Sequence, residues 1–136
     1  FEFDIMFPEQ LPRYSNFNVH LRSSQRGDRN ASTSYICGVQ FFNFKQIGIS
    51  YRSPFTSENI SDRLPKSFQS NTWYRHRFEV KGKKIKWFIN GALQLQTEDS
   101  RISTGLPLIN IGGHSPDNEG NGGLFYFDNI LVESLD

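Results

Sequence analysis

Apolar and polar residues alternate with a period of two along most of this chain. Residues 1–7 alternate between apolar side chains and mostly polar ones, and residues 17–22 repeat the pattern. Such alternation is typical of β-strands that bury one face. It predicts strands over 1–7, 17–22, 35–42 and 46–52, with 46–52 as the hairpin partner of 35–42.

The second half of the chain continues the same pattern. It predicts further strands over 73–80, 84–89, 92–96, 106–111 and 124–133. Asn90-Gly91 is the strongest hairpin signal in the chain, since both residues tolerate a positive φ. The first and last strands are similarly apolar, so we expect them to pair.

The stretches between these strands are polar and are predicted to be loops. They cover 23–34, 53–72 and 112–123, and a single helical turn is considered within 58–64. Alternation also predicts core positions for Trp73 and Trp87, and for Leu93 and Leu95. Cys37 shares an apolar face and is expected to be an inert buried thiol.

About eight or nine short antiparallel strands without a long helix indicate one fold class. We therefore predict an all-β, antiparallel two-sheet β-sandwich. The length of 136 residues is that of one domain, so the prediction is a single domain over 1–136. No run of about 18 apolar residues occurs, so no membrane span is expected.

Charge and cysteine content narrow the function classes. A net charge of +1 argues against a nucleic-acid-binding protein, which usually carries a basic excess. One cysteine excludes an internal disulfide and a cysteine-based zinc site. The chain begins at Phe1 inside a predicted strand, without Met or a signal peptide, so we expect part of a larger multidomain protein or a processed chain.

Three segments carry a family resemblance. Residues 73–82 (WYRHRFEVKG), 85–91 (IKWFING) and 127–132 (FDNILV) resemble the concanavalin A-like lectin/glucanase superfamily. The likeness is nearest to its laminin-G-like and 3-keto-disaccharide-hydrolase-like domains, and 17–22 (FNVHLR) resembles an early strand of that family. The resemblance implies a concanavalin A-like jelly roll, found in secreted, extracellular or cell-surface proteins that act on glycans.

The resemblance also implies a binding face. In lectins and glucanases of this superfamily the concave sheet and its rim loops take the ligand. His20 and Arg22 match the early strand, and aromatic rings and planar polar groups are what sugar recognition needs. The candidate ligand-binding residues are Asn18, His20, Arg22, Gln40, Tyr51, Arg52 and His114.

A second outward face is basic. Alternation gathers Arg75, Arg77, Lys84, Lys86 and Phe88 on it. This face is either a site for an acidic or neutral polysaccharide or a solubilising surface with Glu79 as its counter-ion.

Two catalytic sequence patterns are absent, whereas three histidines and many serines leave Ser-His-Asp catalysis open. The Glu-x-Asp-x-x-Glu pattern of the superfamily's glucanases does not occur, and neither does a Gly-x-Ser-x-Gly elbow. We therefore predict a non-catalytic module of a secreted protein, with a polysaccharide or oligosaccharide as its partner. A small glycoside hydrolase or lyase using His20 and Arg22 stays open, as does a laminin-G-like adhesion module.

A structural calcium ion is a further expectation. Glu2 and Asp4 lie on the polar face of the first strand and would approach Asp128 if the terminal strands pair. Several relatives hold calcium between their terminal strands, and the resemblance places Asp128 at that position. Alternatively, Asp128 only hydrogen-bonds a neighbouring turn. The loop residues 117–119 are a second calcium candidate.

Overall fold

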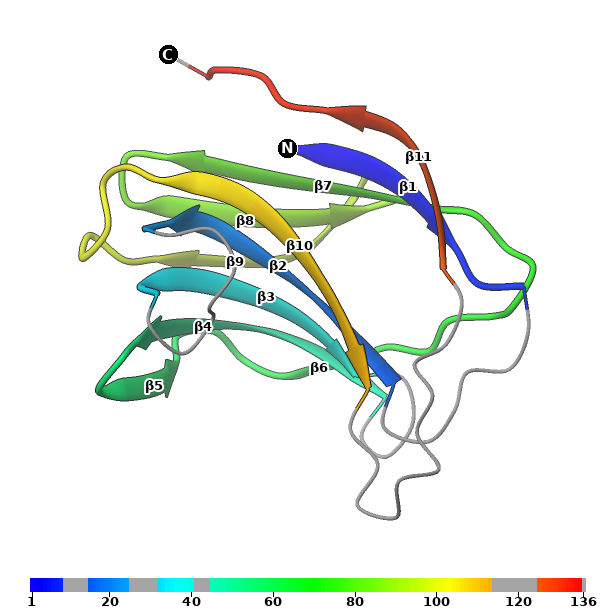
Figure 1. Cartoon of the computed structure of the whole chain (residues 1–136), viewed down its shortest axis with the longest axis horizontal. Helices are drawn as coiled ribbons and strands as arrows, with labels where there is room; N and C mark the ends of the chain where they lie inside the picture. The colour runs from blue at the N-terminus through cyan, green and yellow to red at the C-terminus, as the bar shows by residue number, and fades with distance from the viewer. Residues whose placement is uncertain (9–14, 25–31, 41–44, 114–124, 136) are drawn as a thin grey trace.

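The protein is all-β in the computed structural model, with two layers of antiparallel strands (Figure 1). The structure describes residues 1–8, 15–24, 32–40, 45–113 and 125–135. Within these ranges no helix is long and apolar enough to cross a membrane. The predicted antiparallel two-sheet β-sandwich is confirmed.

One layer is a five-stranded sheet that contains the first and last strands of the chain. Its strand order is β11 (Tyr126–Leu131), β1 (Glu2–Met6), β7 (Tyr74–Lys81), β8 (Lys84–Ile89) and β9 (Ala92–Glu98). The predicted pairing of the terminal strands is confirmed, since β1 and β11 run antiparallel side by side (Figure 1).

The other layer is a six-stranded sheet. Its strand order is β10 (Leu106–Gly113), β2 (Ser15–Ser23), β3 (Ser34–Gln40), β4 (Gln46–Ser53) and β5 (Thr56–Asn59), while β6 (Leu64–Pro65) also pairs with β4. The predicted loop over 53–72 contains two short strands, β5 and β6, and the helical turn considered within 58–64 is not found there. β5 is polar and exposed, so it has no alternation to reveal it, and it forms because β4 offers an unpaired edge.

The core between the layers is aromatic. Phe3 of β1, Phe17 of β2 and Trp87 of β8 are almost completely buried, and Phe3 packs edge-on against Phe17 at a centroid distance of 6.3 Å. Each such burial contributes roughly 1.5–3 kcal/mol. The predicted burial of Cys37 is also confirmed, and burial raises the pKa of its thiol far above the usual range.

Two predicted core residues lie at the surface instead. Trp73 is 47% exposed because it precedes β7 at an odd position, whereas the buried residues of β7 are even-numbered. Leu93 is 47% exposed because of a β-bulge in β9. Trp87 pairs with Leu95 and the next residue of β8 pairs with Leu93, so β9 has one extra residue there. The side chains of β9 on either side of this β-bulge therefore point to opposite faces. Trp87 and Leu95 are buried as predicted.

A two-residue turn joins β8 to β9. Asn90 has a φ of 49° and Gly91 a φ of 81°. Two consecutive positive φ values are the mark of the two-residue hairpin that suits the twist of antiparallel strands. The hairpin predicted from Asn90-Gly91 is confirmed.

Candidate functional site

Cross-strand pairing lines up small and polar residues on the outer face of the six-stranded sheet, the face turned away from the core. Asn110 of β10 lies opposite Asn18 of β2, Asn18 lies opposite Gly38 of β3, and Gly38 lies opposite Gly48 of β4. The row therefore runs from two amide side chains to two positions that have no side chain.

Neighbouring side chains lie over both glycines. The side-chain oxygen Oδ1 of Asn18 is 2.9 Å from the point that a Cβ on Gly38 would occupy. The Cδ, Nε and Cζ atoms of Arg63 lie 2.8 to 3.3 Å from the corresponding point on Gly48. Arg63 can lie flat across β4 only because position 48 is a glycine.

Arg63 is held in this position by β5. Its Nη2 donates a hydrogen bond of 2.7 Å to Oδ1 of Asn59, and the hydroxyl of Ser50 donates to the same oxygen at 3.1 Å. Arg63 itself is exposed. The guanidinium of Arg63 has five N–H donors, and within the described residues its hydrogen bond goes to Asn59, so further N–H groups face solvent. The face thus presents a positioned, solvent-facing donor group beside amides and a hydroxyl.

We call Asn18, Ser50, Asn59, Arg63 and Asn110, with Gly38 and Gly48 beneath them, the polar face. Only Asn18 was among the residues proposed from the sequence. Arg63 and Asn59 lie in the segment predicted to be a loop. The paired glycines at 38 and 48 of adjacent strands were the available signal, since strand glycines often mark close approach of another group.

His20 does not present its ring to solvent. It is 3% exposed, and its Nδ1 lies 3.0 Å from the hydroxyl oxygen of Ser34, which is itself buried. His20 therefore lies on the predicted side of its strand but is covered, and its role in ligand binding stays a prediction.

Arg22 lies away from His20 because of a second β-bulge. β2 has one more residue than β10 between the positions paired with Leu106 and Leu108, and Arg22 adopts a φ of 53°. Its Nη1 donates to the carbonyls of Gly82 at 2.8 Å and Ile102 at 2.7 Å. Arg22 therefore ties β2 to the turn between β7 and β8, and the expected shared face with His20 is not found.

Of the remaining proposed residues, Arg52 lies on the outer side of β4 with Ser50, whereas Tyr51 lies on the opposite side. Tyr51 lies on the inner side of β4, where its ring is 6.3 Å from that of Tyr35 and Arg101 stacks on it at 3.9 Å. Arg52 is half-buried and pairs in register with Ser34, and Gln40 pairs in register with Gln46 at the far end of β3. His114 lies outside the described residues.

Arg101 also organises the acidic residues at the edge of the sandwich. It binds Asp99 through several guanidinium hydrogen bonds and Glu58 through a contact of 2.7 Å. The hydrogen bonds from Arg101 lower the pKa of Asp99 to about 2. A carboxylate held ionised in this way is a structural anion rather than a proton donor.

Two of the three predicted calcium ligands, Glu2 and Asp4, contact the guanidinium of Arg75. Asp4 lies opposite Asp128 in the β1–β11 pair, as expected. Arg75 contacts Glu2 at 3.2 Å and Asp4 at 3.4 Å, and the Asn129 side chain donates to Asp4 at 2.7 Å. No three acidic, histidine or cysteine side chains of the described residues converge on a metal position. These residues do not fit a calcium ion unless Arg75 moves. Residues 117–119 lie outside the described residues.

Comparisons with known proteins agree on the fold. No family model matches the chain, and no curated protein matches its sequence. Among solved structures, the carbohydrate-binding module CBM66 from Bacillus subtilis is similar with a TM-score of 0.69 and 17% identity, covering 94% of this chain and 70% of that one. The galectin LEC-6 of Caenorhabditis elegans is similar with a TM-score of 0.61 and 22% identity, covering 82% and 72%.

At these identities the likeness establishes a lectin-like β-sandwich fold. Membership of the concanavalin A-like superfamily, expected from the sequence, stays a prediction. The narrower resemblance to laminin-G-like or 3-keto-disaccharide-hydrolase-like domains stays a prediction.

Proposed function

We propose that this chain is a non-catalytic carbohydrate-binding module and that the polar face receives the sugar. The observation that carries the proposal is Arg63, which lies across Gly48 and is held by Asn59 while it faces solvent. The description of CBM66 as a carbohydrate-binding module supports this assignment on a similar fold.

Recognition follows from the groups on this face. Sugar hydroxyls accept hydrogen bonds from guanidinium and amide N–H groups, and they donate to amide oxygens such as that of Asn18. Gly38 and Gly48 add no side chains, so the Asn18 and Arg63 side chains can lie close against the sheet and present their polar groups to a ring. Because Arg63 is positioned before the ligand arrives, little side-chain freedom is lost on binding.

The proposed partner is a polysaccharide or an oligosaccharide. We further propose that the module belongs to a larger secreted or cell-surface protein that acts on glycans. Linked binding would then raise the local concentration of substrate for the rest of that protein.

A glycan array with the purified chain tests the proposal. We expect retention on at least one neutral saccharide, and Arg63→Ala should weaken it by roughly tenfold, the loss of one charge-assisted hydrogen bond. Gln69→Ala, in an exposed loop, removes an amide elsewhere and should change nothing. Absence of binding to any plant, algal or microbial glycan, or release of cleaved products from a bound one, would overturn the proposal.

A further inference from the structure

A cluster of lysines covers the opposite side of the molecule, on the outer face of the five-stranded sheet. Lys81 of β7 pairs in register with Lys84 of β8, and Lys86 follows two positions along the same strand. We call these three residues the lysine face. Two surface pockets lie against it, of about 340 Å³ and about 250 Å³, and both are lined by Lys84 and Lys86.

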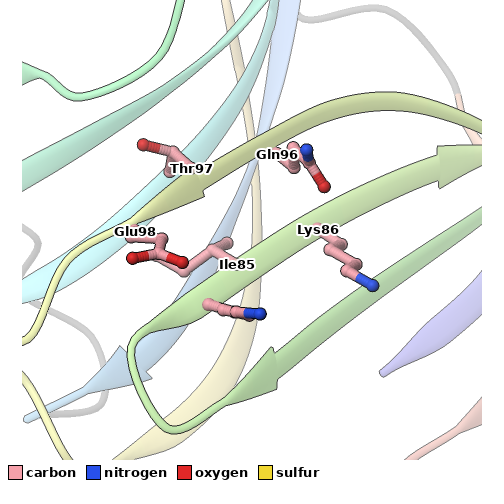
Figure 2. Close-up of a pocket in the computed structure, with 6 residues that line it drawn as sticks. Ile85, Lys86, Gln96, Thr97 and Glu98 are labelled. Carbon is pink, nitrogen blue, oxygen red and sulfur yellow. The ribbon is translucent and has the colours of Figure 1, made fainter.

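Figure 2 shows the larger pocket from outside the sheet. Lys86 of β8 lies beside Gln96 of β9, its partner in the strand register. Glu98 closes one end of the pocket. The pocket is therefore lined by two ammonium groups, an amide and a carboxylate within the width of two strands.

The neighbouring carboxylates are already neutralised by other cations. Glu98 forms a salt bridge of 2.7 Å with Lys83, and Glu79 forms one of 3.3 Å with Arg77. No salt bridge joins Lys81, Lys84 or Lys86 to an acidic residue within the described ranges. Glu98 and Glu79 are the register partners of Lys84 and Lys86, but their salt bridges go to Lys83 and Arg77, so the three lysines form a local positive cluster although the whole chain carries a net charge of only +1.

An apolar strip borders the lysine face. Phe88 follows Lys86 by two positions on β8, and the Arg77 guanidinium lies 4.2 Å from its ring centroid. Leu93 is the register partner of Phe88 and is 47% exposed. A ligand that lies across the sheet would therefore contact the lysine side chains with one part of its length and the apolar side chains of Phe88 and Leu93 with the next.

We propose that this surface is a second binding site, for anionic polysaccharides that carry carboxylate or sulfate groups. Alternate residues of a strand are roughly 7 Å apart, so Lys84 and Lys86, with Lys81 opposite Lys84, form a compact group of point charges suited to a polymer with repeated anions. The exposed Leu93 side chain suits the C–H faces of sugar rings. The site is independent of the polar face, which lies on the other sheet.

Affinity measurements with three defined polymers test the inference. The probes are dextran sulfate, polygalacturonate and neutral dextran, titrated into the intact chain. We expect binding of one or both anionic polymers, and weaker binding as salt is added, because the contacts are screened at the surface. Lys84→Gln/Lys86→Gln should lower the affinity by roughly tenfold.

Two control variants distinguish a specific effect of Lys84 and Lys86 from an effect of net charge and from an effect of the polar face. Lys45→Gln/Lys66→Gln removes the same charge from residues next to β4 and β6 of the other sheet and should bind the anionic polymers normally. Arg63→Ala should do so as well. An equal loss in the Lys45/Lys66 variant, no binding of either anionic polymer, or equal binding of duplex DNA at the same salt would overturn the assignment to a saccharide.

Discussion

The indole N–H of Trp87 donates a hydrogen bond of 3.1 Å to Nδ1 of His76, in the centre of the five-stranded sheet's buried face. Because Nδ1 accepts, the proton of the neutral ring is on Nε2, which has no hydrogen-bond partner within the described residues. The ring stacks against Phe3 at 5.8 Å and Phe78 at 6.1 Å. The sandwich thus holds His76 as a neutral aromatic residue.

This placement predicts loss of stability in acid. Burial lowers the pKa of His76 from 6.5 to about 3 in the folded chain. Between these values the unfolded chain binds a proton that the folded chain does not, so the free energy of unfolding falls as the pH drops from 6.5 towards 3. One proton gives a slope of at most about 1.4 kcal/mol per pH unit. Urea denaturation at a series of pH values measures it.

His76→Phe is the control for this slope. Phenylalanine keeps the stacking on Phe3 and Phe78 but cannot titrate, while Trp87 loses its acceptor at a cost of roughly 1–3 kcal/mol. The variant should be less stable near neutral pH and should show a flatter pH dependence below 6.5. An unchanged slope would mean that other groups cause the acid sensitivity.

Much of the fold follows from period-two alternation. It places Phe3, Val19 and Ile85 in the core, and all three are buried. It fails at Leu93 and Arg22 for one reason, since each lies at or beside a β-bulge that shifts side chains to the other face. A single inserted residue has no signature in a lone sequence.

The candidate site follows from the sequence much less well. Asn18 is predicted on the outer face because its neighbours Phe17 and Val19 are apolar. Arg63 is not predicted, because its position depends on β6 pairing with β4 and on the missing side chain of Gly48, a contact between segments that no local pattern reports. His20 obeys the alternation and is still buried, since alternation predicts the face of a residue and not what covers it.

Gly105→Ala should be strongly destabilising. Gly105 has a φ of 152°, and a Cβ there would collide with the backbone carbonyl of Arg22. The backbone at Arg22 cannot move away without a cost in free energy, because Arg22 lies at the β-bulge and its side chain is hydrogen-bonded to Gly82 and Ile102. We expect a loss of more than about 2 kcal/mol in chemical denaturation.

Gly91→Ala is the matched control for that loss. Gly91 also has a positive φ, of 81°, but nothing lies within 4 Å of the position a Cβ would take. It should cost only the backbone strain, roughly 1 kcal/mol. Similar losses in the two variants would show that the close approach of Gly105 to Arg22 contributes nothing.

Gly48→Ala should weaken saccharide binding without unfolding the protein. The added methyl group would lie 2.8 Å from Cδ of Arg63, so the arginine must leave its place across β4. If the polar face binds the sugar through this guanidinium, affinity should fall by roughly tenfold, as for Arg63→Ala. The double variant should be no weaker than either single one, since both remove the same contact. Additive losses would contradict this coupling.

Calcium should leave the stability of the terminal strands unchanged. Arg75 already neutralises Glu2 and Asp4, and Asp128 accepts a hydrogen bond of 2.7 Å from the backbone N–H of Asn129. Thermal unfolding in calcium chloride and in chelator should therefore coincide, whereas Arg75→Gln should cost roughly 1 kcal/mol by leaving two carboxylates without their cation. A calcium-dependent rise in the melting temperature that disappears in Asp128→Asn would instead show that Arg75 gives way and that the metal binds between β1 and β11.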